Sequence, residues 1–220
     1  MIYLAVDRIF EKHKTPPGHP ESHLRIRKIM EEYEKLKIKE DITIIKASKA
    51  PEEYATLVHD PNHVNYIKTM CMLGGGSITI DTNVSEESYD VALYAIGTVI
   101  KLVEMAIRRR NGMYFAAIRP PGHHATSDFS KGFCIFNNIA IAVKYLQIYH
   151  KLKRVAIIDF DVHHGDGTQS IFYNDPSVLY ISLHQDPRTL YPGTGFPEEV
   201  GDGEGKGFTI NIPLPPGLSS

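Results

Sequence analysis

Apolar positions along the chain fall into two repeating patterns. Short runs rich in β-branched residues predict strands at 2–6, 43–47, 113–118, 155–161, 178–184 and 208–213. Stretches in which apolar residues recur with helical spacing predict helices at 23–38, 52–57, 62–72, 85–108, 137–149 and 168–173. Strands that alternate with helices in this way predict a three-layer α/β fold with a mainly parallel sheet.

Three local patterns add detail to this fold. The run 155–158 has no polar position, which predicts a strand buried on both faces of a sheet. Ser85 is a residue type that caps helices, ahead of a helix whose almost continuously apolar sequence predicts burial. The run Gly74-Gly75-Gly76-Ser77 lacks the lysine and the spacing of a phosphate-binding loop, so we expect a flexible connector there.

The composition is typical of a soluble globular protein. Its 220 residues are 42% hydrophobic and 23% charged, and we expect one domain over 1–220. A net charge of -2 provides no basic field, which argues against direct nucleic-acid binding. No segment approaches the roughly 20 apolar residues that cross a bilayer, and the first residues do not resemble a signal peptide. We expect a cytoplasmic protein without membrane contact, and a homo-oligomer is left open.

The two cysteines, Cys71 and Cys134, are far apart and form no paired motif. This spacing argues against a disulfide framework and against a thiolate zinc site. We therefore expect buried free thiols.

Side chains that can bind a metal or transfer protons are concentrated in the segment 159–167, directly after the apolar run 155–158. In open α/β sheets, ligands bind at the carboxyl ends of the strands. Side chains alternate faces along a strand, so Asp159, Asp161 and His163 would point the same way if the strand continued that far. Two of them could then bind one metal ion.

A second group of such residues follows the predicted strand 113–118, in the segment Arg119-Pro120-Pro121-Gly122-His123-His124. The prolines stiffen this loop, and histidine transfers protons near neutral pH. We expect His123-His124 and His163-His164 to face one pocket, with Asp159 and Asp166 orienting the imidazoles.

Several motifs occur together in one order along the chain. They are GHPE (18–21), His59-Asp60-Pro61, RPPGHHA (119–125), GFCIFNNIAIA (132–142), DFDVHHGDGTQ (159–169), SLH (182–184) and YPGTG (191–195). Together they resemble the histone deacetylase superfamily. The likeness is greatest to class II deacetylases and their bacterial and archaeal relatives, including acetylpolyamine amidohydrolases and acetoin-utilisation proteins.

This resemblance implies a zinc-dependent amidohydrolase on the arginase/deacetylase α/β fold. Its substrate would be an N-acetyl amide, such as a protein acetyl-lysine, an acetylpolyamine or a small metabolite. Asp161 and His163 would be metal ligands, His123 and His124 would handle protons, and Asp159 and Asp166 would orient the two histidines. Aspartate and histidine also bind Fe2+ or Co2+, so these ions are alternatives to Zn2+.

The resemblance extends to a substrate channel and to monovalent cations. Gly132 and Phe133 would line the channel opposite Tyr191, and Asp81 would hold the substrate backbone at the rim. One potassium ion would lie among Asp159, Asp161, His163, Ser182 and Leu183. A second would bind main-chain oxygens of Phe172, Asp175, Val178 and Phe208, where ordinary strand and turn packing is an equally good explanation.

Two features of the family, a third metal-ligand aspartate and a carbonyl-polarising tyrosine, would lie beyond Ser220. We therefore expect this sequence to be the N-terminal portion of the family's domain, with an apolar sheet edge exposed. An inactive acyl-binding paralogue and a fragment completed by another chain are alternatives. A two-manganese amidinohydrolase of the arginase kind shares the fold, but its bridging carboxylates are spaced differently.

Overall fold

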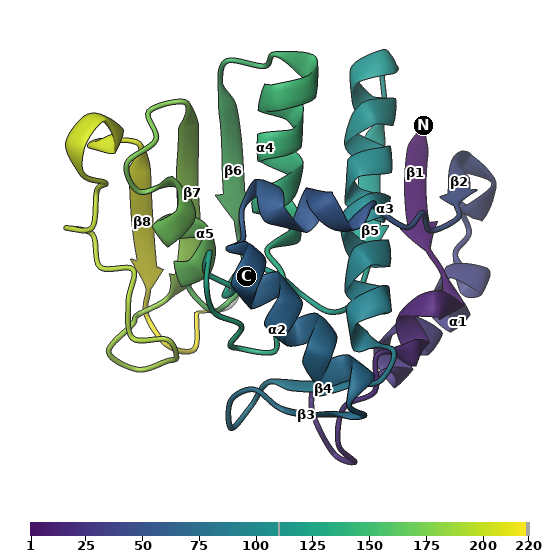
Figure 1. Ribbon diagram of the computed structural model, residues 1–220. Coiled ribbons are helices and arrows are strands. Elements are labelled where there is room, and N and C mark those ends of the chain that lie inside the picture. The colour runs from purple at the N-terminus through teal and green to yellow at the C-terminus, as the bar shows by residue number, and fades with distance from the viewer. Residues whose placement is uncertain (110, 219–220) are drawn as a thin grey trace.

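The fold is described from a computed structural model, for residues 1–109 and 111–218 (Figure 1). Its main strands are β1 (Ile2–Val6), β2 (Ile42–Ile45), β5 (Met113–Ala117), β6 (Val155–Asp159), β7 (Val178–Gln185) and β8 (Thr209–Leu214). Its α-helices are α1 (Leu24–Lys35), α2 (Pro61–Met72), α3 (Ser88–Arg108), α4 (Asn138–His150) and α5 (Asp166–Phe172). Shorter elements are the strands β3 (Gly75–Ser77) and β4 (Asn83–Ser85) and the 3-10 turns η1 (Arg8–Lys12), η2 (Lys39–Asp41), η3 (Glu52–Leu57) and η4 (Gly203–Gly205).

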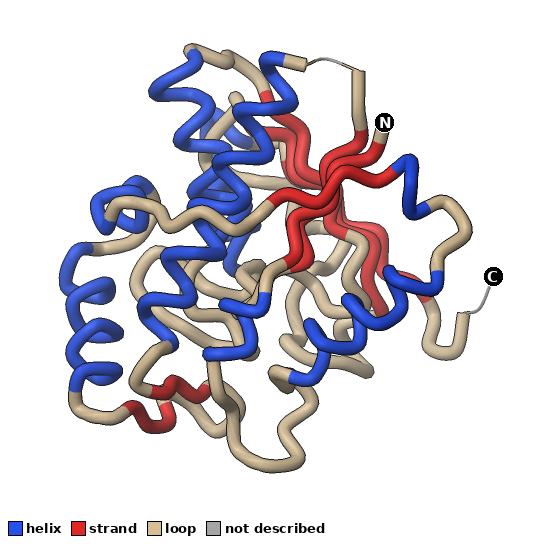
Figure 2. Tube along the Cα trace, turned by 90° about the vertical axis from the view of Figure 1, so that its right-hand side faces the viewer, coloured by secondary structure: helices blue, strands red, loops and turns tan. Residues whose placement is uncertain are grey.

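The long strands form two parallel sheets, in the orders β2-β1-β5 and β6-β7-β8. Within them Val6 pairs in register with Ala117, and Asp159 with Ser182. Helices lie on both sides of the strand layer, which confirms the predicted three-layer α/β architecture (Figure 2). The prediction of one domain over 1–220 includes residues outside the described ranges and stays a prediction.

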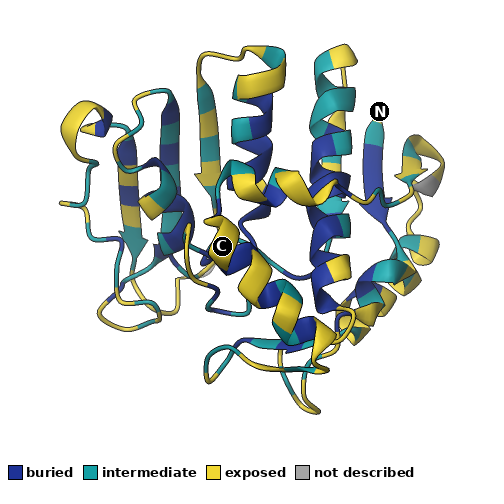
Figure 3. Ribbon diagram, viewed as in Figure 1, coloured by how far each residue is buried: buried dark blue, intermediate teal, exposed yellow. Residues whose placement is uncertain are grey.

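Two of the three buried hydrophobic clusters in the described residues meet at helix α3, and Figure 3 shows the buried residues along this helix. Helix α3 contributes to both, because its apolar residues surround most of its circumference. On one side Ile96 and Ile100 pack with Ile135, Phe136 and Ile141, and on the other Val91 and Ala95 pack with Leu4, Phe10 and Ile26. This packing fixes α4, and with it the loops on either side, against α3.

Strand β6 differs from its prediction. Ile158 is 61% exposed and Ala156 is also exposed, although the apolar run predicted burial on both faces. Val155 and Ile157 on one face pack against the buried cluster of α4 and α5, whereas Ala156 and Ile158 on the opposite face are left exposed. Among the described residues β6 pairs only with β7, so its other edge is also unpaired. The predicted apolar sheet edge is therefore present, and it lies between the two sheets.

Two further predictions were wrong in the region before α3. Gly75–Ser77 is strand β3, paired with Asn83–Ser85, and at Gly75 (φ +89°) a Cβ atom would collide with the backbone of Val84. Helix α3 begins at Ser88, because Ser85 is already used in this hairpin. The Ser88 Oγ atom accepts a hydrogen bond from the Ser85 backbone N–H at 2.7 Å.

Two predictions on the chain's environment can be compared with the described residues. Cys71 and Cys134 are free and buried, as the sequence predicted. Within residues 1–109 and 111–218, no helix has the length and apolar character needed to cross a bilayer.

Candidate active site

A cavity of about 590 Å³ lies at the carboxyl ends of β5 and β6. The loop after β5 contributes His123 and His124, and the loop after β6 contributes Asp161 and His163. This position agrees with the general rule that parallel sheets bind ligands at their carboxyl ends. The channel residues expected from the sequence also line it, namely Asp81, Gly132, Phe133 and Tyr191.

Each histidine of the tandem pair contacts its own carboxylate. His123 Nδ1 lies 3.0 Å from Asp159 Oδ2, and His124 Nδ1 lies 2.7 Å from Asp166 Oδ1. The two ring centroids are 4.0 Å apart. Because both Nδ1 atoms are engaged by carboxylates, the Nε2 atoms are available for a molecule bound in the cavity.

The environment shifts the pKa values of the two histidines in opposite directions. Burial opposes the charged form of His123, but the hydrogen bond and charge of Asp159 outweigh burial and raise its pKa. At His124 burial dominates over the hydrogen bond of Asp166, and the charge of His123 adds to it, so the pKa is lowered. The pair therefore combines an imidazole that favours the protonated form with one that favours the neutral form.

The two orienting carboxylates have further partners that sequence reasoning missed. Asp159 Oδ2 accepts a hydrogen bond from the Tyr180 hydroxyl at 3.2 Å, and Asp166 Oδ2 lies 2.5 Å from Lys131 Nζ. Burial opposes ionisation of both carboxyl groups, but their histidine partners, together with Tyr180 at Asp159 and Lys131 at Asp166, outweigh burial and lower both pKa values. Lys131 directly precedes the Gly132 motif and could have been suspected, whereas Tyr180 lies within a strand and gave no signal.

Asp161 and His163 come together through a turn instead of a continued strand. Strand β6 ends at Asp159, and the Asp161 side chain accepts a hydrogen bond from the His163 backbone N–H at 2.8 Å. Asp161 Oδ1 then lies 3.0 Å from His163 Nδ1. These two neighbouring donors suit a divalent cation. No group of three or more potential metal ligands occurs among the described residues.

His164 was predicted to face the cavity, and this prediction was wrong. Its ring is buried, with Nδ1 at 2.9 Å from Thr194 Oγ1 and Nε2 at 2.9 Å from Gln169 Oε1. Burial, aided by the charge of His184, lowers its pKa to about 4. The turn that directs His163 into the cavity directs its neighbour to the opposite side.

The channel walls depend on unusual backbone conformations. Gly132 has φ +56° and packs against the His124 ring so closely that a Cβ atom would collide with it. Phe133 also has a positive φ of 68°, and its N–H donates to Thr82 Oγ1 at 3.0 Å. Tyr191 contacts the other side of the cavity, with its ring 5.0 Å from that of His124.

Asp81 lines this cavity. Its carboxylate accepts hydrogen bonds from the hydroxyls of Thr79 at 2.6 Å and Thr82 at 2.9 Å. Burial opposes its ionisation, but these bonds outweigh burial and lower its pKa. These bonds favour a negative charge in the wall of the cavity.

Comparison with known proteins identifies the family. A model described as "Histone deacetylase domain" matches residues 19–220. The chain belongs to the histone deacetylase family. It is 46% identical over 208 residues to the "Probable deacetylase" of Archaeoglobus fulgidus, which covers 94% of this chain and 57% of that relative. It is 37% identical to "Histone deacetylase 5" of Arabidopsis thaliana, which covers 96% of this chain and 34% of the relative.

A solved structure shares the fold of this deacetylase-family chain. The crystal structure of the HDA15 HD domain matches with a TM-score of 0.89 at 35% identity, over 96% of this chain and 61% of that one. The α/β fold is thus that of histone deacetylase domains. The chain spans little more than half of the archaeal relative and about a third of the plant one.

The first group of residues predicted to bind potassium in this family member lies beside the cavity. Asp159 and Ser182 are paired across β6 and β7, and the Asp161 N–H donates to Asp159 Oδ1 at 3.2 Å. His163 follows in the same loop, and Leu183 follows Ser182 in β7. These contacts bring most of the group together, and potassium binding stays a prediction.

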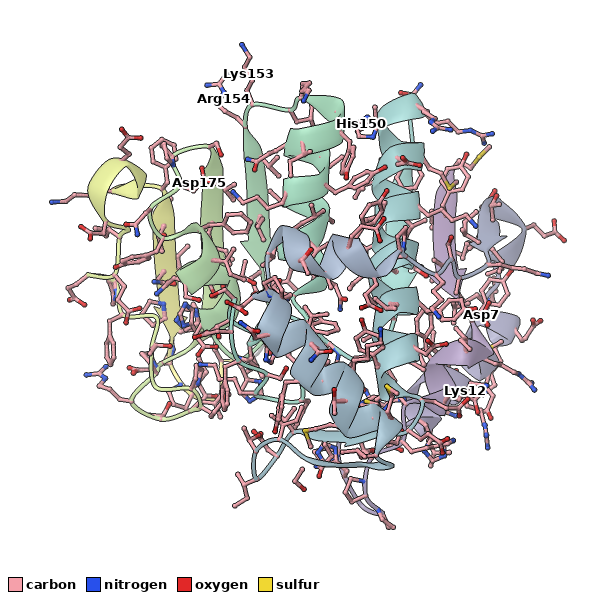
Figure 4. The ribbon with its side chains drawn as sticks, viewed as in Figure 1. Asp7, Lys12, His150, Lys153, Arg154 and Asp175 are labelled. Atoms are coloured by element: carbon pink, nitrogen blue, oxygen red, sulfur yellow. The ribbon has the colours of Figure 1, made fainter. Side chains whose placement is uncertain are left out.

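The second predicted potassium group lies at the other end of the sheet. Asp175 precedes β7 at its amino end, away from the cavity (Figure 4). The carbonyl oxygens of Phe172, Asp175 and Phe208 accept backbone hydrogen bonds from Asp175, Val178 and Tyr180, respectively. Each oxygen can accept a second interaction, so this site also stays a prediction.

Arg119 is a further site-supporting residue whose role the motif did not reveal. Its guanidinium is 1% exposed and binds both carboxylate oxygens of Glu21 at 2.5 Å. It also donates to the carbonyl oxygens of Phe10 at 2.8 Å and His13 at 3.0 Å. Arg119 therefore ties the loop of the tandem histidines to the N-terminal segment.

Proposed function

We propose that the cavity hydrolyses N-acetyl amides, with the tandem histidines as the proton-transfer groups. The observation that carries this proposal is the pair of histidine–carboxylate contacts beside Asp161 and His163 in one cavity. Amide hydrolysis requires a proton to be taken from water and a proton to be delivered to the leaving amine. Two imidazoles with opposite charge preferences can supply both functions.

The roles of the two histidines are proposed from their surroundings. His124 is biased toward the neutral form, so its Nε2 atom is the proposed acceptor of the proton from water. His123 is biased toward the protonated form by Asp159, so it is proposed to hold positive charge beside the reacting carbonyl. Asp166 and Asp159 keep the two Nδ1 atoms occupied and fix the ring orientations.

The proposed metal position is formed by Asp161 and His163. A divalent ion there, Zn2+ with Fe2+ or Co2+ as alternatives, would polarise the amide carbonyl and acidify water. The donor types and their 3.0 Å separation fit two positions of such a site. Catalytic zinc commonly has three protein ligands, so these two alone are expected to bind it weakly.

The proposed substrate is an acetylated amine with an extended chain, such as an acetyl-lysine or an acetylpolyamine. Gly132 removes bulk beside His124, and Tyr191 and Phe133 provide aromatic surface that would cover a methylene chain. The Asp81 carboxylate in the cavity wall can accept hydrogen bonds from a peptide N–H or a second amine. For the cellular setting we propose a reducing cytoplasm, because both cysteines are free.

Acetate release from an acetyl-lysine peptide and from acetylputrescine, with Zn2+, Co2+ or Fe2+ added, tests the proposal. We expect His124→Gln to lower turnover by about 10²–10⁴-fold, the usual contribution of a general base. His150→Gln is the matched control, because His150 lies at the opposite end of the fold (Figure 4). Replacing K+ by choline in the same assay tests the proposed potassium sites.

Three results would contradict the proposal in different ways. Binding of the acetylated ligand without acetate release would indicate an acyl-binding protein. Turnover that His124→Gln leaves unchanged would show that the proton-transfer assignment is wrong. Metal titration monitored by Co2+ absorbance gives a readout independent of turnover, and an unchanged spectrum in Asp161→Asn would remove Asp161 from the proposed metal site.

A further inference from the structure

A second cavity, of about 520 Å³, shares the β3–β4 hairpin with the candidate active site. Helix α2 contributes His63 and Tyr66 to its wall, the turn of the hairpin contributes Ile78, and the loop after the tandem histidines contributes Asp128 and Phe129. The hairpin packs against α2, beside which Figure 1 shows it. Three separate segments therefore meet around this cavity.

Two carboxylates in the wall are only partly engaged. Asp60 Oδ1 accepts a hydrogen bond from the Asn62 N–H at 2.7 Å at the start of α2, and Asp128 Oδ1 accepts one from the Thr126 hydroxyl at 2.9 Å. Within the described residues, the second oxygen of each carboxylate has no hydrogen bond. No lysine or arginine is found among the residues that line the cavity. The wall thus presents negative charge without a cation of its own.

His63 adds an acceptor that is held in place from behind. The side chain is only 7% exposed, and its Nε2 atom lies 3.0 Å from Ser130 Oγ. The Ser130 hydroxyl donates to the Ile135 carbonyl oxygen at 2.7 Å, so it can only accept from the His63 Nε2–H. Burial lowers the pKa of His63 against the opposing charges of Asp128 and Asp60, which favours the neutral ring. Its Nδ1 atom is then an acceptor with no partner in the described part of the chain.

Aromatic surface completes the wall. Tyr66 is 49% exposed and Phe129 is 46% exposed, and both line the cavity. Aromatic ring faces attract cations. An ammonium or guanidinium group donates several hydrogen bonds and accepts none, so it matches two carboxylates and an imidazole acceptor beside aromatic rings.

This cavity is a close neighbour of the candidate active site. Ile78 lines the second cavity and Asp81 of the same hairpin lines the first, and Phe129 and Gly132 are related in the same way in the next loop. Three residues of chain span at most about 10 Å. An extended peptide bound in the active site advances about 3.3 Å per residue, so its neighbouring side chains can reach this distance.

We propose that the second cavity binds the side chain of an arginine or lysine that lies two to four residues from the acetyl-lysine of a peptide substrate. This inference rests on the proposed function and selects basic peptides within its substrate class. A peptide branches at the acetyl-lysine Cα atom and can therefore cross the hairpin to the second cavity. An acetylpolyamine has no such branch, because its amines continue in line from the acetyl group.

The test uses matched acetyl-lysine peptides that carry either arginine or its neutral isostere citrulline at one position, two to four residues on either side of the acetyl-lysine. Acetate release gives kcat and KM, and fluorescence anisotropy of labelled peptides gives Kd without turnover. We expect arginine to be preferred about five- to tenfold at one or more positions, through KM and Kd and not through kcat.

Two variants connect this preference with the cavity. Asp60→Asn/Asp128→Asn removes both charges and keeps an oxygen that can cap α2, and it should reduce the preference for arginine below about twofold. Glu204→Gln is the matched control for a change in net charge, because Glu204 is an exposed residue of η4 outside the cavity. It should retain the preference of the wild type.

The possible results separate this proposal from the proposed hydrolysis. Equal binding of the arginine and citrulline peptides at every position, or no binding of either, would overturn the assignment of the cavity. A preference that survives in the double variant, or that Glu204→Gln also abolishes, would overturn it as well. Spermidine that binds more tightly than the arginine peptide, and only when Asp60 and Asp128 are intact, would replace the peptide by a free polyamine. A preference for arginine in Kd without acetate release would support the cavity and contradict the hydrolysis.

Discussion

The buried ion pair between Arg119 and Glu21 allows a quantitative test of how the histidine loop is held. Replacing Arg119 by Met removes the cation and leaves the Glu21 carboxylate, only 2% exposed, without its bidentate partner. Breaking one side of a buried pair costs about 3–5 kcal/mol in unfolding free energy. For a chain of this length we therefore expect the melting temperature to fall by about 10 °C.

The pH dependence of this loss provides a second readout. His13 Nε2 lies 3.6 Å from Glu21 Oε2, and burial together with the Arg119 charge lowers its pKa to about 4. Without Arg119, burial still lowers the pKa of His13 but is opposed by the Glu21 charge alone, so the pKa in the folded variant is less depressed than in the wild type. A His pKa depressed in the folded state costs stability as the pH falls below the unfolded value, and this cost is greater in the wild type than in the variant. The loss caused by the substitution should therefore be smaller at pH 6 than at pH 8.

Urea unfolding followed by circular dichroism at both pH values measures these free energies. The double variant Glu21→Met/Arg119→Met is the matched control, because it removes both charges and should recover most of the loss. A loss below about 1 kcal/mol in the single variant would refute the reasoning. So would a double variant that is as unstable as the single one.

Three other changes test the cavity and the fold. Gly132→Ala should lower acetate release with a smaller effect on urea unfolding, because its Cβ atom would displace the His124 ring. In Lys131→Met the Asp166 carboxylate interacts with His124 without the competing lysine, which raises the pKa of His124 and should shift the acid limb of the pH–rate profile to higher pH. Lys144→Met, which removes the lysine beside the remote Asp175, should leave the profile unchanged. Burial lowers the pKa of His59 to about 4. When the pH falls from 7 to 4, the free energy of unfolding measured in urea should therefore decrease by about 3 kcal/mol less in His59→Gln than in the wild type.

Local patterns were sufficient to predict the long parallel strands, the approximate positions of the helices and the carboxyl-end position of the cavity, but not the β3–β4 hairpin or the start of α3. They could not predict the exposure of Ala156 and Ile158 on β6, because an apolar run does not reveal whether both faces of a strand are covered. The orientations of His163 and His164 depend on the turn made by Asp161, which side-chain alternation along a strand does not describe.

Long-range pairing is the second part that the sequence did not reveal. Glu21 and Arg119 are 98 residues apart in the chain, and each belongs to a motif that by itself suggests no partner for the other. Tyr180 likewise reaches Asp159 only because β6 and β7 are paired. Such contacts follow from the topology, which local periodicity leaves open.

The β3–β4 hairpin supplies one wall of the cavity, separate from the parallel-strand loops that carry the histidines. Asp81 and Thr82 lie between these two strands, and Thr82 links the Asp81 carboxylate to the backbone of Phe133. His19 joins this group from the N-terminal segment, through the Asp81 carbonyl at 3.0 Å and the Phe133 ring at 4.7 Å. Insertions or substitutions in the hairpin can therefore change which molecules enter, while the histidines on the parallel-strand loops keep their geometry. Divergence of substrate preference among related chains is expected to concentrate in this hairpin.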